Sequence, residues 1–257
     1  MNTLTRHVRA RAILSAGACM ALAGCGATVA STSGGGVPAA TAPGHAASVS
    51  VGSGPGPGGG SAASGASIPF PTAVGDTWVY KLSFALGSGS TATDKVVANV
   101  PVAGGRQVTI VQTSEGLTTR LVFVFHPDGS ITYPVAEVGG QTTSADGILW
   151  PPASVIASRQ PVRQQVRMHN GVGSQTDLVQ TTVQGAGTAT VTVPAGTYQA
   201  TIVNVTMTVP FGGGSITVEV RTWFAPAVGP VKSETLTTRG GNTTVTARTE
   251  LTSFAKV

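Results

Sequence analysis

Residues 203–209 read Val-Asn-Val-Thr-Met-Thr-Val, a strict alternation of apolar and polar side chains. The glycine-rich segment Phe-Gly-Gly-Gly-Ser follows at 211–215, and residues 216–221, Ile-Thr-Val-Glu-Val-Arg, alternate again. A period of two places every apolar side chain of such a run on one face of an extended strand. Two such runs joined by a short glycine segment are typical of a β-hairpin. This stretch therefore predicts antiparallel strands with one buried face.

The same signals extend outward in both directions. A second hairpin is expected where residues 123–126 and 131–133 flank the turn Pro127-Asp128-Gly129. No long segment keeps a helical stripe, and only one short helix is expected, near 152–158. The sequence predicts an all-β fold, an antiparallel, strongly curved sheet or half-barrel of about ten strands. The remaining strands are expected at 76–84, 93–100, 106–114, 162–169, 176–184, 188–193, 231–238 and 243–254.

The composition changes sharply before this β domain, which we expect to span 68–257. Residues 26–67 contain almost only Gly, Ala, Ser, Thr and Pro, with four valines and no charged or aromatic side chain. Such a segment cannot bury enough apolar surface to offset its chain entropy. We therefore expect residues 25–67 to form a disordered, flexible linker.

The first 24 residues have the pattern of an exported protein's signal peptide. Arg6, Arg9 and Arg11 form a basic start, and residues 12–22 are uncharged and mostly apolar. That stretch is too short to span a membrane, which needs about 20 residues, and it suits the apolar region of a signal peptide. An ordinary signal peptide with an incidental cysteine is the alternative interpretation.

The end of this segment resembles the lipobox of bacterial lipoproteins. Leu22, Ala23 and Gly24 precede Cys25, as a branched apolar residue and two small residues precede the cysteine that receives lipid. The chain has two cysteines, and Cys19 lies in the segment to be removed. Cys25 is therefore expected to be the lipid attachment site, with acyl chains such as palmitate tethering the protein to a membrane. Gly26 favours the outer membrane in a Gram-negative cell; otherwise the outer face of the cytoplasmic membrane is expected.

Charge and motifs argue against several classes of function. The chain has 15 Lys and Arg against 10 Asp and Glu, and the three arginines before Cys25 leave 12 against 10. No basic cluster interleaved with aromatics is present, so no nucleic-acid partner is expected. His45, His126 and His169 form no metal-binding spacing, and the β domain has no Gly-x-Ser-x-Gly nucleophile motif. The sequence predicts no metal site, no cofactor and no catalytic residues.

Three segments resemble motifs of exported β domains of unknown function. They are Pro69–Tyr80, with its Val-Gly pair and Trp-x-Tyr strand, Val193–Tyr198, Val-Pro-Ala-Gly-Thr-Tyr, and Thr222–Lys232, which contains Trp-Phe-Ala-Pro-Ala-Val-Gly-Pro. The group is similar in architecture to periplasmic half-barrels, including LolA/LolB-like lipoprotein carriers, and the resemblance implies a fold but no activity. Ala227 stands where glycine is commoner. We interpret the motif residues as structural: Gly75, Trp78, Pro194, Gly196, Trp223, Pro226 and Gly229.

Three functions follow in order of preference. The first is a non-catalytic lipoprotein whose β domain binds an apolar or lipid-like envelope ligand, because small side chains leave more interior space than aromatics. The alternative is a structural or interaction protein of the cell envelope, with a solid core and an envelope protein as partner. A hydrolase, whose Ser, His and Asp would have to come together from distant strands, ranks last.

Overall fold

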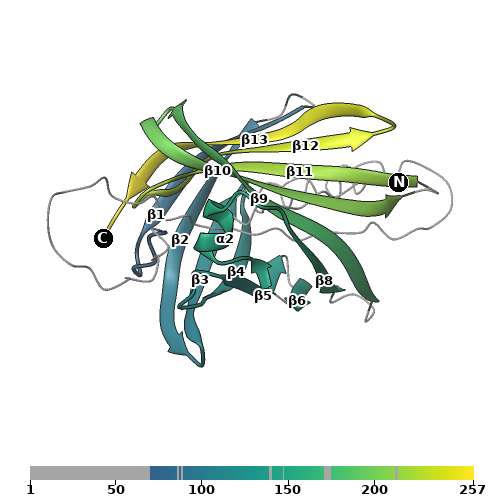
Figure 1. Ribbon diagram of the computed structural model, residues 1–257. Helices are drawn as coiled ribbons and strands as arrows, with labels where there is room; N and C mark the ends of the chain where they lie inside the picture. The colour runs from purple at the N-terminus through teal and green to yellow at the C-terminus, as the bar shows by residue number, and fades with distance from the viewer. Residues whose placement is uncertain are drawn as a thin grey trace, which may run out of the picture.

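The computed structural model describes residues 70–85, 87, 89–138, 141–146, 148–170, 175–211 and 214–257 (Figure 1). The signal peptide, Leu22, Ala23, Gly24, Cys25 and the linker lie outside these residues. The described chain is almost entirely β-structure with one short helix, α2 (Ala153–Ala157). The strands are β1 (Thr77–Phe84), β2 (Gly89–Val102), β3 (Gly105–Ser114), β4 (Leu117–Phe125), β5 (Ile131–Val138), β6 (Gln141–Asp146), β7 (Ile148–Trp150), β8 (Val162–Asn170), β9 (Gln175–Val193), β10 (Gly196–Phe211), β11 (Gly214–Ala225), β12 (Gly229–Arg239) and β13 (Asn242–Ala255).

The hairpin that opened the sequence analysis is confirmed. β10 and β11 pair antiparallel, with Val205 opposite Val220 and Met207 opposite Val218. All four of these side chains are buried, while Thr206 and Glu219 between them are half-exposed. The second hairpin, β4 with β5, and the short helix near 152–158 are also confirmed.

Two details of the strand pattern differ from the prediction. The runs at 176–184 and 188–193 were expected as separate strands because Gly185 and Gly187 lie between them, but β9 continues through both. The pairing with β10 shifts at a β-bulge, where Ile202 and Val203 lie opposite Gly187 and Gly185. The bulge accommodates the two glycines, and strand β9 continues past them. A side chain at Gly185 would collide with the carbonyl of Ile156 in α2, so a glycine is needed where the helix crosses β9. β6 and β7, by contrast, were not expected, because β6 is mostly polar and β7 has only three residues.

The strands form one antiparallel sheet that curves strongly, as predicted (Figure 1). Thirteen strands of the described chain follow the order β4-β3-β2-β1-β13-β12-β11-β10-β9-β8-β6-β5-β7. The sheet curls so far that β4, at one end of this order, also pairs with β5 near the other end. The junction of β6 with β8 is short, with four residue pairs between Thr143–Asp146 and Arg167–Asn170. The curvature places the buried faces of distant strands opposite one another.

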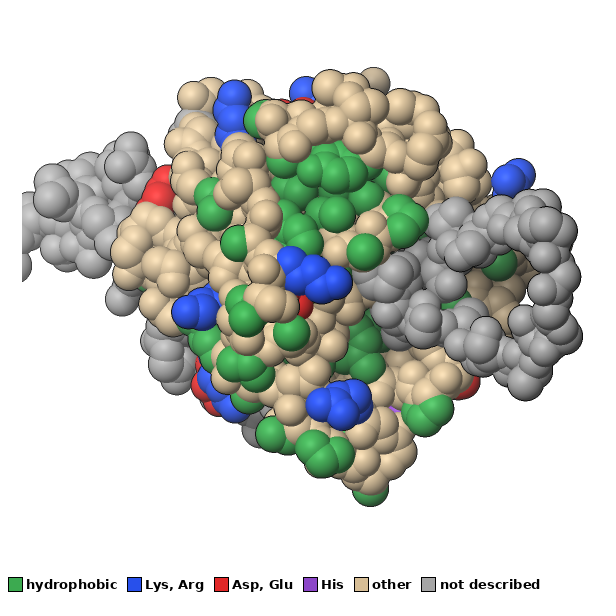
Figure 2. Space-filling view, turned by 90° about the vertical axis from the view of Figure 1, so that its left-hand side faces the viewer, with side chains coloured by type: hydrophobic (Ala, Val, Ile, Leu, Met, Phe, Trp, Pro, Cys, Tyr) green, Lys and Arg blue, Asp and Glu red, His purple; other side chains and the backbone are tan. Residues whose placement is uncertain are grey.

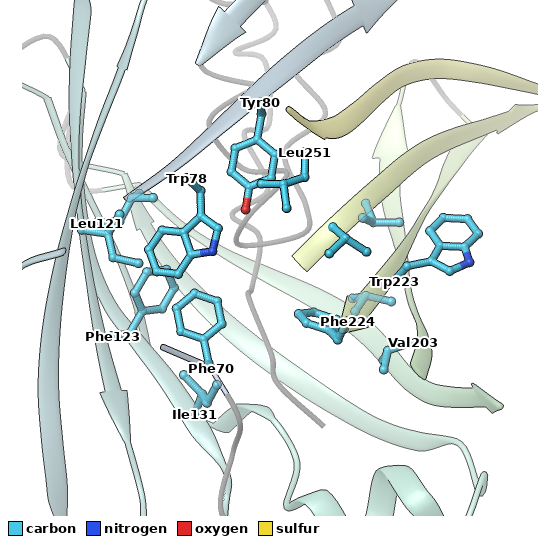
Figure 3. Close-up of a cluster of buried hydrophobic side chains, with 14 of the residues drawn as sticks. Phe70, Trp78, Tyr80, Leu121, Phe123, Ile131, Val203, Trp223, Phe224 and Leu251 are labelled. Carbon is cyan, nitrogen blue, oxygen red and sulfur yellow. The ribbon is translucent and has the colours of Figure 1, made fainter. Parts of the chain in front are cut away.

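The core divides into two regions of different composition. One, which we call the aromatic half, comprises Phe70, Trp78, Tyr80, Leu121 and Phe123, all buried. The other, which we call the valine half, is the buried face of β8 to β11. Figure 3 shows Phe70, Trp78 and Phe123 gathered on one side and Val203 with Phe224 on the other. The valine half consists of Val166, Val179, Val183, Val203, Val205, Met207, Val218 and Val220.

Candidate functional site

Two of the three motif segments meet at the aromatic half. Trp78 Nε1 donates a hydrogen bond of 2.7 Å to the carbonyl of Val228, and the Tyr80 hydroxyl donates one of 3.0 Å to the carbonyl of Pro230. Phe70 stacks on Trp78, with ring centroids 5.3 Å apart. Gly229 has a φ of 91°, and a Cβ there would lie 3.1 Å from the ring of Phe70. The buried indole and phenol therefore satisfy their polar atoms on the turn that joins β11 to β12.

Gly75 and its neighbour fix the entry to β1. Gly75 has a φ of 105°, and its amide donates to the carbonyl of Val96 at 2.9 Å. The next residue, Asp76, is fully buried, and its carboxylate accepts hydrogen bonds from the amides of Ala73 at 2.9 Å and Val257 at 3.1 Å. This carboxylate thereby joins the start and the end of the described chain.

The third motif forms the turn between β9 and β10. Pro194 is exposed at its tip, and Gly196 has a φ of 139°, which favours glycine. The amide of Ala195 donates to the carbonyl of Leu251 in β13, and the Tyr198 hydroxyl donates to the carbonyl of Ala195. Since Leu251 pairs with Tyr80, this turn also packs beside the aromatic half.

Trp223 and Pro226 lie apart from this cluster. The indole of Trp223 points away from the neighbouring Phe224 (Figure 3), and Lys232 Nζ lies 4.8 Å from its ring centroid. Pro226 is exposed in the turn after β11, next to Ala227, whose φ is 59°. Ala227 therefore occupies a left-handed position that glycine adopts with less strain, which explains why glycine is commoner there.

The aromatic half also holds a buried acid that the sequence analysis did not single out. Asp94 in β2 is fully buried, and its cross-strand neighbours are Trp78 in β1 and Gln112 in β3. Burial raises the pKa of Asp94 to about 8, a rise that the side-chain amide of Gln112 partly opposes. The Gln112 amide lies near Asp94 without reaching hydrogen-bonding geometry, and neither oxygen of Asp94, nor the amide oxygen of Gln112, has a hydrogen-bond partner. The negative charge of Asp94 adds to the effect of burial in raising the pKa of Tyr80.

A sequence signal for Asp94 existed. Ala92, Asp94 and Val96 alternate with exposed residues, so an acid shares the apolar face of a predicted strand. Charged residues are almost never fully buried unless they are paired, which makes that placement informative. The alternation within one strand does not predict which residue lies beside Asp94, because Gln112 belongs to another strand.

The remaining predicted residues do not gather into a site. His126 lies at the end of β4, with Nδ1 2.9 Å from the carbonyl oxygen of Gly104 and Nε2 3.2 Å from the Thr132 hydroxyl. His45 lies outside the described residues, as does Cys25. Within the described ranges, no group of three His, Cys, Asp or Glu side chains could hold a metal ion. None of the helices in that part of the chain is long and apolar enough to cross a bilayer.

Comparison with known proteins agrees with this fold. Residues 150–250 match the model of a family described as DUF3108-like. The match runs from the end of β7 into β13 and includes Pro194, Trp223 and Gly229, while Trp78 and Asp94 lie outside it. No curated protein matches the chain.

Solved structures provide the wider comparison. A protein described as exported, with a YmcC-like fold, from Bacteroides fragilis superposes with a TM-score of 0.52 at 17% identity, covering 73% of this chain and 98% of that one. A protein described as a lipoprotein from Parabacteroides distasonis has a TM-score of 0.46 at 17% identity, over 73% and 98% of the two chains. The hypothetical lipoprotein YmcC from Escherichia coli has a TM-score of 0.35 at 9% identity, over 72% and 88%. At these identities the first comparison supports the fold alone.

Proposed function

We propose that this chain is an exported, lipid-anchored protein of the bacterial cell envelope. In this proposal residues 1–24 are a signal peptide, Cys25 carries the lipid, residues 25–67 are the linker, and residues 68–257 form the β domain. The basic start, the short apolar region and the lipobox-like ending support it. The similarity in fold to a protein described as exported adds support. The membrane is the outer one in a Gram-negative cell and otherwise the cytoplasmic membrane.

The anchor is tested by mass spectrometry of the N-terminal peptide from the native host. We expect a chain that begins at Cys25 and carries acyl groups, and we expect Cys25→Ser to release the protein from the membrane fraction. Cys19→Ser is the matched control, since it changes a cysteine in the segment to be removed, and should leave both properties unchanged. An unmodified Cys25, or a mature chain that begins elsewhere, contradicts the anchor.

For the β domain we propose a non-catalytic role, the binding of an apolar or lipid-like ligand from the envelope. The observation that carries this proposal is the valine half, a buried face made of aliphatic side chains on strongly curved strands. A concave face of this kind, with few polar groups, is the usual lining of a site for an apolar ligand. Figure 2 shows that apolar side chains also gather in one area of the face that forms the left-hand side of Figure 1.

Native mass spectrometry of the full chain carrying Cys25→Ser tests this role. We expect the protein to retain an apolar molecule from its host. Val218→Phe should reduce that retention, because Val218 is fully buried in the valine half and phenylalanine occupies more volume. Val97→Phe is the control, since Val97 is 43% exposed. Two results together would instead favour an envelope interaction protein with a solid core. They are that the protein carries no ligand, and that Val218→Phe destabilises it as much as overpacking destabilises a filled core.

A further inference from the structure

The most unusual chemistry in the described chain is the pair of Asp94 and Gln112. Both side chains are at most 2% exposed, and they face each other across β2 and β3 on the buried side of the sheet. Three oxygens, two on Asp94 and one on Gln112, have no hydrogen-bond partner. Buried polar atoms normally find partners, so three oxygens without a hydrogen-bond partner in one place need an explanation.

We propose that the Asp94–Gln112 pair binds the primary ammonium group of an amphiphile whose apolar chain lies against the valine half. This inference rests on the proposed function, because it assumes that the β domain takes up an apolar ligand, and it adds the head group. The amphiphile is defined by its chemistry, a protonated primary amine on an aliphatic chain.

The count of donors and acceptors selects this head group. A primary ammonium carries three N–H donors and no acceptor, and the pair offers three unpartnered acceptor oxygens once Asp94 is ionised. A hydroxyl brings one donor, and a quaternary ammonium brings none. A carboxylate or a phosphate would set acceptors against acceptors in a buried position, where unpaired polar groups are costly.

The electrical balance points the same way. Among the described residues Asp94 has no ion pair with Lys or Arg, and the other titratable group that it influences is Tyr80, which is neutral at physiological pH. A buried carboxylate without a counter-ion holds its proton, and an arriving ammonium supplies that counter-ion. The carboxylic acid then releases its proton to solvent, and a carboxylate–ammonium pair forms with no other bond broken.

The experiment is calorimetric titration of the full chain carrying Cys25→Ser with three probes of equal chain length. These are decylamine, decanol and decyltrimethylammonium, each below its micelle or solubility limit. We expect decylamine to bind about tenfold more tightly than either other probe, or better, with release of a proton that is detected by repeating the titration in buffers of different ionisation enthalpy. The affinity for decylamine should rise between pH 6 and pH 8, as Asp94 gives up its proton more readily.

Substitutions locate the effect. Asp94→Asn should lower the affinity for decylamine to that for decanol and abolish proton release, and Gln112→Met should lower it several-fold. Glu137→Gln removes one acid from the surface, where Glu137 pairs with Arg120, and should leave all three affinities unchanged. Thermal unfolding of each variant verifies that it is folded.

The outcomes separate this inference from the function on which it rests. Three equal affinities, or an Asp94→Asn variant that keeps the preference for decylamine, would overturn the ammonium site and leave apolar binding intact. If none of the probes binds to the folded protein, the proposed apolar ligand fails together with its head group.

Discussion

The aromatic half and the valine half are parts of one sheet, yet they are held in different ways. Trp78 and Tyr80 donate hydrogen bonds to backbone carbonyls of the turn after β11, and Phe70 closes over them. The valine half is mostly aliphatic, with the buried hydroxyl of Thr181 among its valines, and it is held chiefly by burial. Directional bonds at one end specify one arrangement, whereas aliphatic packing at the other tolerates several. We therefore expect the aromatic half to hold one fixed arrangement of side chains and the valine half to accommodate changes in packing.

The largest expected effect comes from removing an anchor of the aromatic half. Trp78→Ala should destabilise the fold by about 3–5 kcal/mol, because it leaves a cavity under Phe70 and an unpaired carbonyl at Val228. Trp223→Ala removes the same kind of side chain where it is 9% exposed and lies beside Lys232, and it should cost less because no buried carbonyl loses a hydrogen bond. Urea unfolding measures both. Equal costs would mean that the aromatic half has no special role.

The buried acid at the edge of the aromatic half gives the next effect. The pKa of Asp94 is about 8 in the folded protein, against 3.8 for an aspartate side chain that is free in water. Between those values the unfolded chain loses this proton while the folded chain keeps it, so stability falls as pH rises, by up to about 1.4 kcal/mol per pH unit, and levels off above the folded pKa. Asp94→Asn should remove this slope and exceed the wild type in stability at pH 8.

Urea unfolding at pH 4, 6 and 8 compares the two proteins. The difference between them isolates Asp94 from other titrating groups such as Glu234, whose pKa is lowered by Lys232 and Arg248. A variant with the wild-type slope would contradict the raised pKa of the buried carboxyl.

Small enlargements of the core probe the two halves directly. Ala92 lies between Tyr80 and Ser114 in the sheet and is 1% exposed, so Ala92→Val should cost about 1–3 kcal/mol through overpacking. Val205→Leu adds one methylene to the valine half and should cost less than about 1 kcal/mol if that face adapts. The denaturant midpoints of the two variants and the wild type, measured at one pH, give the two costs in stability. The reverse order would place the solid packing in the valine half.

The smallest effect is expected at the turn that accepts the hydrogen bonds of the aromatic half. Ala227→Gly should stabilise the protein by about 0.5–1 kcal/mol, because glycine adopts the φ of 59° without the strain of a Cβ. Ala195→Gly is the control, because Ala195 does not have a positive φ. That change only raises the entropy of the unfolded chain, so it should lower the stability of the protein. A melting temperature that falls in both variants would argue against strain at Ala227.

The sequence predicted the fold well where each strand carries its own signal. Alternation in 203–221 and the turn at Pro127-Asp128-Gly129 are local patterns, and both hairpins form as expected. The continuity of β9 was missed because the glycines at 185 and 187 indicate a break locally, and only the bulge that they form in β9 and the passing helix explain them. A glycine therefore mispredicts the end of a strand when a distant element, such as the helix here, is the reason for its presence.

The candidate site was harder to predict for the same reason. Trp78 was singled out by its motif, but its bond to Val228 joins residues 150 positions apart. The inward placement of Asp94 follows from alternation, whereas its position opposite Gln112 depends on the register of β2 with β3, which a bulge between Val96 and Ala98 shifts. A single strand reveals which side chains face inward, and only the assembled sheet reveals which of them lack a partner.

The place of Phe70 has a mechanical consequence. This residue is where the described domain begins, it is buried against Trp78, and β1 begins at Thr77 with β2 on one side and β13 on the other. A pull on the chain from its N-terminal side would load two ladders of hydrogen bonds together, besides an aromatic stack. The domain would therefore resist force at the very point where a tether would apply it, and strain would reach the valine half last.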